Sequence, residues 1–341
     1  MTTIDVHAHL FPPSAMERLR AGRRWYGSTL EQGTRGNPIL VTNGRKRALG
    51  ADSHLIDAAG RVSRMDELRV DVQVLSLVPL LFGYDLGLDD AVAMTSDTND
   101  EIAGYVRDYP GRFLGLANVP VNDTDRAIAE LERVIGLDEF VGLTLGSNVN
   151  GRSWDDPRLF PILEAAERLD AYVFFHPIDV RAGNVLTDYY TRNLIGNPLE
   201  TTMLVASLIF GGVLDRLPRL RLCLAHGGGY GTIAIGRFDH GKRVRPEAEH
   251  LKTLPSDLLR RFHVDALVHS EQAVRYLVDV MGVERVVLGS DFPADMGPVD
   301  PVGEIERNPL LTDEEKRAIL GGNLQRELGV TARFVAAGSP A

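Results

Sequence analysis

The chain has 341 residues, of which 44% are hydrophobic and 25% are charged, a balance typical of globular proteins that excludes a largely disordered chain or a membrane span. Its formal net charge of −10 argues against a nucleic-acid surface, which would need a basic stripe, so we expect neither nucleic acid nor membrane as a partner. The single cysteine, Cys223, excludes an intramolecular disulfide. A removable leader does not fit before His7, so we expect a cytoplasmic protein.

The first apolar run contains two histidines. Ile4-Asp5-Val6-His7-Ala8-His9 is typical of a β-strand, and Leu-Phe-Pro-Pro breaks that strand directly afterwards. Side chains alternate along a strand, so His7 and His9 share a face and can converge on one metal ion. The pair therefore lies at the carboxyl end of the first strand and is a candidate metal site.

The next stretch lacks a clean helical or strand period. Residues 20–59 are rich in Gly, Arg, Asn and Thr, and we predict a small insertion there, within about 14–60, that contains a short β-hairpin unit. We expect it to lie over the mouth of the main fold. Longer loops are also expected at 179–197 and 294–308.

Seven further apolar runs follow, most of them after a helix-like stretch such as Asp123–Ile135. They are Val72–Leu77, Phe113–Val119, Phe140–Leu145, Ala171–His176, Arg221–His226, His263–Val268 and Arg285–Ser290. Eight apolar strands that alternate with helices predict an α/β fold, a (β/α)8 TIM barrel, which typically needs about 250 residues. We predict one metal-dependent barrel domain over residues 1–330, followed by a tail at 331–341.

Polar residues also mark the ends of later strands. The fifth run ends at His176, the sixth ends at His226, and Asp291 directly follows the eighth. In a barrel, these ends meet His7 and His9 at one rim, where TIM-barrel active sites lie. Histidines and a carboxylate gathered at one rim predict a functional metal site.

Several phrases of the sequence resemble the amidohydrolase superfamily, in particular the branch of 2-amino-3-carboxymuconate-6-semialdehyde decarboxylase. They are Asp5–Pro12, Met65–Val74, Phe82–Tyr84, His176-Pro177, Ala225–Gly229 and Leu288–Pro293. The resemblance extends from Ile4 to Leu328 and implies a barrel with a metal centre.

The resemblance also implies a ligand set. Binuclear members of the superfamily carry a bridging lysine at the end of the fourth strand, and Phe140–Gly146 contains none, so one metal ion per chain is expected. The implied ligands are His7, His9, His176 and Asp291. Three imidazoles and one carboxylate suit Zn²⁺ best, although Mn²⁺ and Fe²⁺ stay possible.

Catalytic and substrate-binding residues follow from the same resemblance. His226 would lie outside the ligand set and assist proton transfer, with Asp291 beside it, because histidine titrates near the range of a metal-bound water. Arginine clamps carboxylates well, and the family's two arginines correspond to Arg47, with Arg45 as the alternative, and to Arg237. The resemblance implies that Arg237 reaches the site of a neighbouring subunit, so a homodimer is expected.

These residues together predict a metal-dependent, non-oxidative decarboxylase of a small unsaturated or aromatic carboxylic acid. The alternative is a metal-dependent hydrolase of a lactone, amide or ester, for which a metal-bound hydroxide would serve as nucleophile. The two arginines favour decarboxylation.

The loop after His176 lacks the aromatic residue that the family carries there, and Tyr189 or Tyr190 could supply a stacking surface instead. The apolar segment Met203–Leu214 could help to form a dimer interface.

Overall fold

The structure is a computed structural model that describes residues 2–33, 38–42, 44–49 and 57–330. Eight parallel strands form one sheet in the order β1-β5-β6-β7-β8-β9-β10-β11. The strands are β1 (Ile4–Leu10), β5 (Val72–Leu77), β6 (Phe113–Ala117), β7 (Phe140–Gly146), β8 (Tyr172–His176), β9 (Arg221–Leu224), β10 (Phe262–Asp265) and β11 (Val286–Val287). The predicted tail at 331–341 lies outside the described residues.

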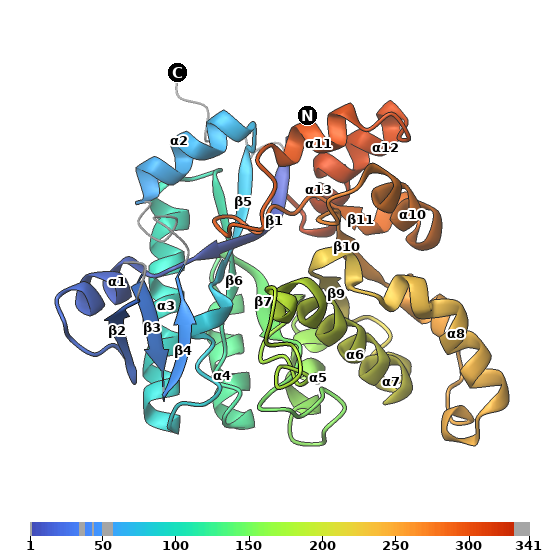
Figure 1. Cartoon of the computed structure of the whole chain (residues 1–341), viewed down its shortest axis with the longest axis horizontal. Coiled ribbons are helices and arrows are strands. Elements are labelled where there is room, and N and C mark those ends of the chain that lie inside the picture. Colours follow the sequence, from blue (N-terminus) through green and yellow to red (C-terminus); the bar gives the residue numbers. More distant parts are fainter. Residues whose placement is uncertain (1, 34–37, 43, 50–56, 331–341) are drawn as a thin grey trace.

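The sheet closes on itself. The amide of Val6 on β1 donates to the carbonyl of Leu288, just after β11, at 3.0 Å, and Ala8 pairs in parallel with Phe292. The first and last strand regions are therefore neighbours, which confirms the predicted TIM barrel (Figure 1).

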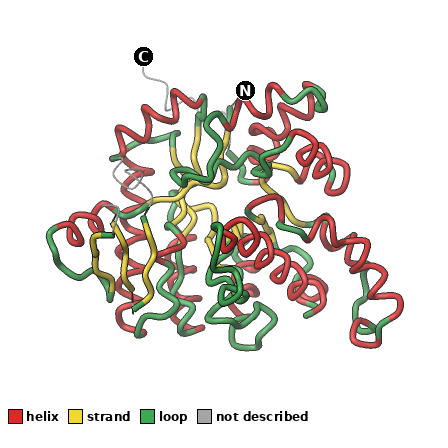
Figure 2. Tube along the Cα trace, in the orientation of Figure 1, coloured by secondary structure: helices red, strands yellow, loops and turns green. Residues whose placement is uncertain are grey.

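Helices surround the barrel, as the secondary-structure colours in Figure 2 show. They are α1 (Pro13–Arg20), α2 (Ala58–Leu68), α3 (Leu88–Asp108), α4 (Thr124–Ile135), α5 (Phe160–Arg168), α6 (Asn197–Phe210), α7 (Val213–Arg216), α8 (Gly231–Val244), α9 (Pro255–Leu259), α10 (Glu271–Met281), α11 (Pro301–Arg307), α12 (Asp313–Arg317) and α13 (Asn323–Glu327). In α4 the Asp123 side chain caps the amide of Arg126, and Ala127, Leu131 and Val134 share the buried face. None of the described helices is long and apolar enough to cross a membrane.

The region after β1 folds as a small separate sheet. Three antiparallel strands occur there in the order β2-β3-β4, and they are β2 (Ser28–Gln32), β3 (Pro38–Thr42) and β4 (Arg45–Ala48). The sheet lies beside α1 at the edge of the view in Figure 1. It contains one strand more than the hairpin that the composition suggested.

A bulge in β1 sets which side chains enter the barrel. The register with β5 shifts between Asp5 and Ala8, so three steps along β1 match two along β5. Ile4 and Val6 pack in the barrel interior with residues from most of the other strands. The extra residue lets His7 also turn inward, although it directly follows Val6. Strict alternation would have placed Val6 and His7 on opposite faces.

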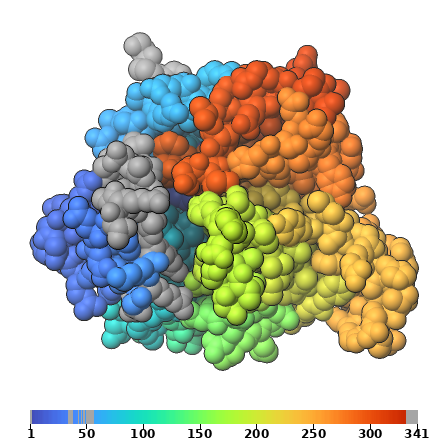
Figure 3. Space-filling model, viewed as in Figure 1, coloured from blue at the N-terminus to red at the C-terminus, as the bar shows by residue number. Residues whose placement is uncertain are grey.

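Two long loops border the carboxyl ends of the strands. Residues 177–196 follow β8 and end in a short π-helical segment, η3 (Arg192–Gly196), which continues into α6. Figure 3 shows this loop, in yellow-green, near the middle of the face that it presents. The loop after β11 carries Asp291. Long loops at this rim give the barrel a deep, shaped site.

Candidate metal centre

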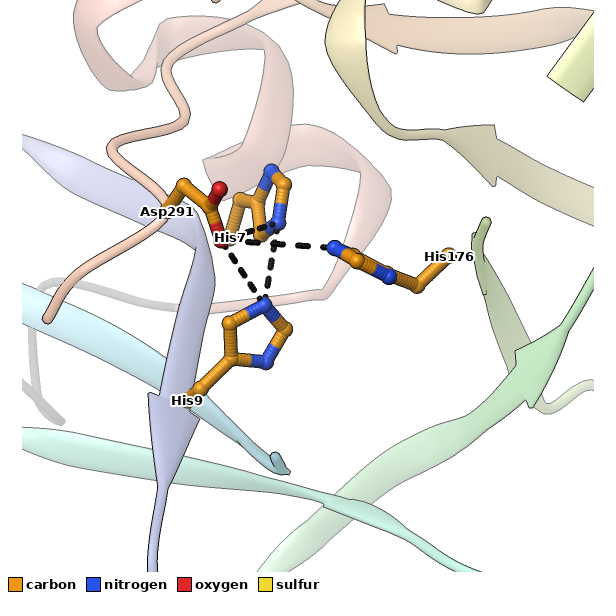
Figure 4. A group of neighbouring side chains, drawn as sticks. All are labelled: His7, His9, His176 and Asp291. Carbon is orange, nitrogen blue, oxygen red and sulfur yellow. Dashed lines mark hydrogen bonds and ion pairs between the residues drawn. The ribbon is translucent and has the colours of Figure 1, made fainter. Parts of the chain in front are cut away.

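Four side chains converge at the carboxyl ends of the barrel strands, namely His7, His9, His176 and Asp291, and each offers a ligand atom within 4.8 Å of the others. Asp291 Oδ1 lies 3.2 Å from His7 Nε2, 3.0 Å from His9 Nε2 and 4.0 Å from His176 Nε2. Figure 4 shows the three rings directed at one point beside the carboxylate. The structure thus brings together the four ligands implied by the sequence.

Each histidine has its other ring nitrogen engaged elsewhere. His7 Nδ1 bonds Asp265 Oδ2 at 2.7 Å, His9 Nδ1 bonds Ser76 Oγ at 2.9 Å, and His176 Nδ1 bonds the Pro177 carbonyl at 2.9 Å. When Nδ1 donates these bonds, Nε2 of each neutral ring is left with a lone pair that faces the centre. All three rings therefore present the atom that binds metal.

Asp265 is a functional residue that the sequence reasoning missed. It is buried at the end of β10, and it also accepts hydrogen bonds from the amides of Gly227 and Leu267 at 2.9 and 3.2 Å. A carboxylate behind a ligating histidine fixes the ring and strengthens its basicity. The predicted seventh strand ran on to Val268, which placed Asp265 inside the strand and hid its position at the rim.

The ionisable groups of the centre favour a bound cation. Burial alone would raise the pKa of Asp291, but the positive charge of His7 holds that pKa well below its usual range. Burial lowers the pKa of His176 well below its ordinary value. Burial also acts to lower the pKa of His7, but the carboxylates of Asp291 and Asp265 outweigh it and raise the pKa to about 10. A divalent ion at the four ligands would take the place of the His7 proton.

The residues present fit a divalent metal ion. His176 Nε2 is buried and has no hydrogen-bond partner within the described structure, a costly arrangement that a metal–ligand bond would resolve. Three imidazole nitrogens with one carboxylate oxygen form a donor set used by metalloenzymes. These observations support a divalent metal at the end of the barrel.

His226 lies beside the ligand group. Its Nε2 is 3.5 Å from Asp291 Oδ2, whereas the other three histidines approach Oδ1. Its Nδ1 is buried without a partner among the described residues. After it, Gly227, Gly228 and Gly229 all have positive φ, and a Cβ on Gly229 would lie 2.2 Å from the Pro198 carbonyl oxygen. The glycines thus make a tight turn against α6 and hold His226 at the rim.

A cavity of about 800 Å³ opens onto the metal centre. His9, His176 and Asp291 lie in its wall, and apolar side chains line much of the rest, among them Phe11, Leu80, Ile178, Val180 and Met296. Two described cations, Lys46 of the inserted sheet and Arg192 of η3, also line it. Asp179 and Asp295 line it as well, and Lys46 Nζ lies 2.6 Å from Glu31 Oε2. The cavity can hold a small molecule next to the ligands.

A second cavity of about 350 Å³ reaches the same centre from another side. Asp291 lines both cavities, whereas His226 and His269 line the second and not the first. His269 borders the second cavity but does not belong to the ligand group.

The two predicted arginines are placed differently. The Arg47 side chain, like that of Arg45, is outside the part of the chain that the structure describes. Their neighbour on β4, Lys46, lines the large cavity. Arg237 lies exposed on α8 and lines neither cavity of its own chain.

Much of the predicted interface segment Met203–Leu214 packs within its own chain. Leu204, Val205, Leu208 and Ile209 are buried in the core, as the inner face of α6. Met203 and Phe210 are half-buried, so only a small apolar surface of this segment is left for contact with a partner, and its part in an interface stays a prediction.

Comparison with known proteins shows the family of the chain. The profile of a family described as amidohydrolase matches residues 4–329. The chain belongs to that family. It is 38% identical over 332 residues to 2-amino-3-carboxymuconate-6-semialdehyde decarboxylase of Dictyostelium discoideum, covering 96% of this chain and 91% of the relative.

Solved structures agree with this membership. The 5-carboxyvanillate decarboxylase of Sphingomonas paucimobilis superposes with a TM-score of 0.82 at 25% identity, covering 97% of this chain and 99% of that chain. A dihydroxybenzoic acid decarboxylase from Polaromonas sp. JS666, solved with bound manganese and an inhibitor, has a TM-score of 0.76 at 20% identity, covering 98% and 99% of the two chains. The second likeness shows that the fold is shared.

Proposed function

We propose that this amidohydrolase-family protein is a metal-dependent, non-oxidative decarboxylase of a small unsaturated or aromatic carboxylic acid. The observation that carries the proposal is the convergence of His7, His9, His176 and Asp291 on the wall of a large, mostly apolar cavity that cations also line. The similarity to a decarboxylase over 96% of the chain supports this chemistry over hydrolysis.

The four ligands would hold one divalent ion, and Zn²⁺ suits three imidazoles and one carboxylate best. Mn²⁺ is the main alternative, because a solved decarboxylase of the same fold contains manganese. A bound ion supplies a Lewis acid that polarises oxygen atoms of the substrate or of water.

The protein's own residues would do the remaining work. Arg192, with Lys46 that also pairs with Glu31, would attract an acid into the cavity, and the apolar wall with Tyr190 favours a planar, conjugated body. When the bond to the carboxylate carbon breaks, its electron pair passes into the conjugated system. The carbon left behind then takes a proton, and His226 at the edge of the site is the group placed to hold or move it.

We also propose a homodimer in which Arg237 of the partner subunit and Arg47 hold carboxylates of the substrate. Arg237 is exposed on α8, close to the exposed apolar residues Tyr230 and Ile233 of the same region. Such a patch next to a cation is suited to contact with a second copy.

A substrate panel tests the proposed reaction. Metal-loaded protein is incubated with ortho-hydroxy and ortho-amino aromatic acids and muconate semialdehydes, and released carbon dioxide is measured. Lactones and amides of the same size are tested for ring opening or hydrolysis in parallel. We expect carbon dioxide from at least one acid. Hydrolysis without carbon dioxide release would contradict the proposal.

A further inference from the structure

Arg61 on α2 is buried against the outer side of the barrel wall, behind the metal centre. Only 3% of its surface is exposed, and it forms no ion pair with any described residue. A buried guanidinium without a carboxylate at hand is costly unless other groups satisfy its donors. The identity of those groups therefore shows what Arg61 is for.

The guanidinium contacts two of the three strand ends that carry metal ligands, those of β1 and β11. One of its nitrogens, Nη2, donates to the backbone carbonyl of His9 on β1. Its central carbon lies 4.8 Å from the ring centroid of Phe292, the residue directly after Asp291. These two segments are also joined directly, because the His9 amide donates to the Phe292 carbonyl at 2.6 Å. Arg61 thus braces the junction from which two ligands project.

A series of hydrogen bonds also connects Arg61 to Asp5, through Gln73. Arg61 Nη1 donates to Gln73 Oε1 at 2.9 Å, and Gln73 Nε2 donates to Asp5 Oδ2 at 3.1 Å. The fully buried Asp5 accepts the amides of His7 at 3.1 Å and of Ser290 at 3.0 Å, and the Ser290 hydroxyl at 2.6 Å. The buried donors and acceptors that link Arg61, Gln73 and Asp5 are therefore matched. At one end of this series Arg61 contacts His9, and at the other end Asp5 contacts His7 and Ser290.

We propose that Arg61 is a positioning residue of the metal centre, which fixes the strand end of His9 against that of Asp291. It acts through the backbone of His9 and the ring of Phe292 and does not touch the reacting atoms. The proposal rests on the metal site of the proposed function, but it does not depend on which reaction that site performs.

Two substitutions separate positioning from general packing. Arg61→Met keeps most of the side-chain volume and removes the donors, whereas Arg61→Lys keeps a cation without the planar fork that reaches two acceptors. Arg221→Met is the matched control. Arg221 is a partly buried arginine, with Nε 2.8 Å from Glu327 Oε1 and its guanidinium 5.8 Å from the Tyr172 ring centroid. It lies at the start of β9, the opposite end of the barrel from the metal centre.

The experiment measures metal binding in the absence of substrate. Zn²⁺ affinity is determined by competition with a chelator, the visible spectrum of Co²⁺-loaded protein reports coordination geometry, and denaturant unfolding reports stability. We expect Arg61→Met to weaken Zn²⁺ binding about 10-fold to 100-fold and to change the Co²⁺ spectrum, with Arg61→Lys between it and the unchanged protein. Arg221→Met should lower stability alone.

Wild-type affinity and spectrum in the Arg61 variants would overturn the proposal, as would equal changes in Arg221→Met. Arg61→Lys supplies the result if Arg61→Met does not fold. Because no substrate is present, the metal-binding result can be interpreted even if the protein proves not to be a decarboxylase.

Discussion

The residues of the metal centre illustrate what sequence can and cannot predict. His7, His9, His176 and Asp291 follow from strand ends and the resemblance to a family, because ligands at one rim need only correct strand positions. The groups behind them, such as Ser76 and Arg61, come from other elements whose packing no periodicity encodes. They required the structure.

His226 is predicted to act on protons and not to bind the metal. His226→Ala should keep the metal and lose about 10²-fold to 10⁴-fold in turnover, the usual contribution of general acid–base catalysis. Metal content by elemental analysis and turnover on the best acid of the panel measure both effects. His269→Ala is the control, since His269 lines the same second cavity but is not in the ligand group. A metal-free His226→Ala protein would show instead that His226 is a ligand.

His263 is predicted to make the fold less stable in acid. Burial in β10 lowers the pKa of His263 to about 4 from 6.5, so the unfolded chain binds a proton below pH 6.5 that the folded chain does not take up until about pH 4. Stability therefore falls as the pH drops through this window, by about 2 kcal/mol at pH 5 from this group alone.

Denaturant unfolding at pH 7 and pH 5 checks this sign. His263→Asn should lose about 2 kcal/mol less than the wild type between the two pH values. His240→Asn, at an exposed position of α8, should behave as the wild type. If His263→Asn kept the pH dependence of the wild type, His263 would not be the group that lowers stability in acid.

At the scale of elements, the sequence predicted strand positions well and their details less well. Val72–Leu77 matches β5 at both ends, whereas Arg285–Ser290 is reduced to Val286–Val287 in β11. Apolar runs locate buried strands, but strand ends depend on hydrogen bonds with neighbours. The bulge in β1 has no sequence signature of its own, although it decides that His7 faces the barrel interior.

The loop after β8 is predicted to depend on Glu200 of α6. The fully buried Glu200 accepts bonds from the Arg181 amide at 2.6 Å and from Arg181 Nε at 3.1 Å, and Asn148 Nδ2 lies 3.2 Å away. Glu200→Ala leaves these donors unpaired and should cost about 3 kcal/mol of stability. Because Ile178 and Val180 of this loop line the cavity, KM should rise while metal content stays normal.

Steady-state kinetics and elemental analysis measure these effects of Glu200→Ala. Glu132→Ala removes an exposed ion pair with Arg168 and should change neither quantity. Normal KM in a folded Glu200→Ala protein would mean that the loop keeps its shape without this contact.

At the scale of the whole molecule, the barrel and the family were predictable because eight buried strands and the spaced ligands leave few alternatives. Decarboxylase chemistry is also favoured by the relatives over the hydrolase alternative. Subunit assembly was not predictable in the same way. It depends on which exposed residues meet a second copy, and Met203–Leu214, which the sequence offered, is largely buried.

The proposed shared site can be tested by mixing subunits. Arg237→Ala and His9→Ala proteins should each be inactive alone, since one lacks the donated arginine and the other lacks a ligand. After subunit exchange, mixed dimers should regain activity, because one of their two sites combines an intact metal centre with an intact Arg237. Exchange shown by differently tagged subunits, without recovered activity, would eliminate the shared site.

The central claim is that one divalent ion, held by His7, His9, His176 and Asp291, is needed for decarboxylation. The most direct measurement is a titration of metal-free protein with Zn²⁺ or Mn²⁺, in which carbon dioxide release is followed against metal added per chain. We predict a linear rise that levels off at about one equivalent, and no recovery in His9→Ala, because loss of one ligand opens the coordination shell. Activity in the metal-free protein, or a plateau only at two equivalents, would contradict it.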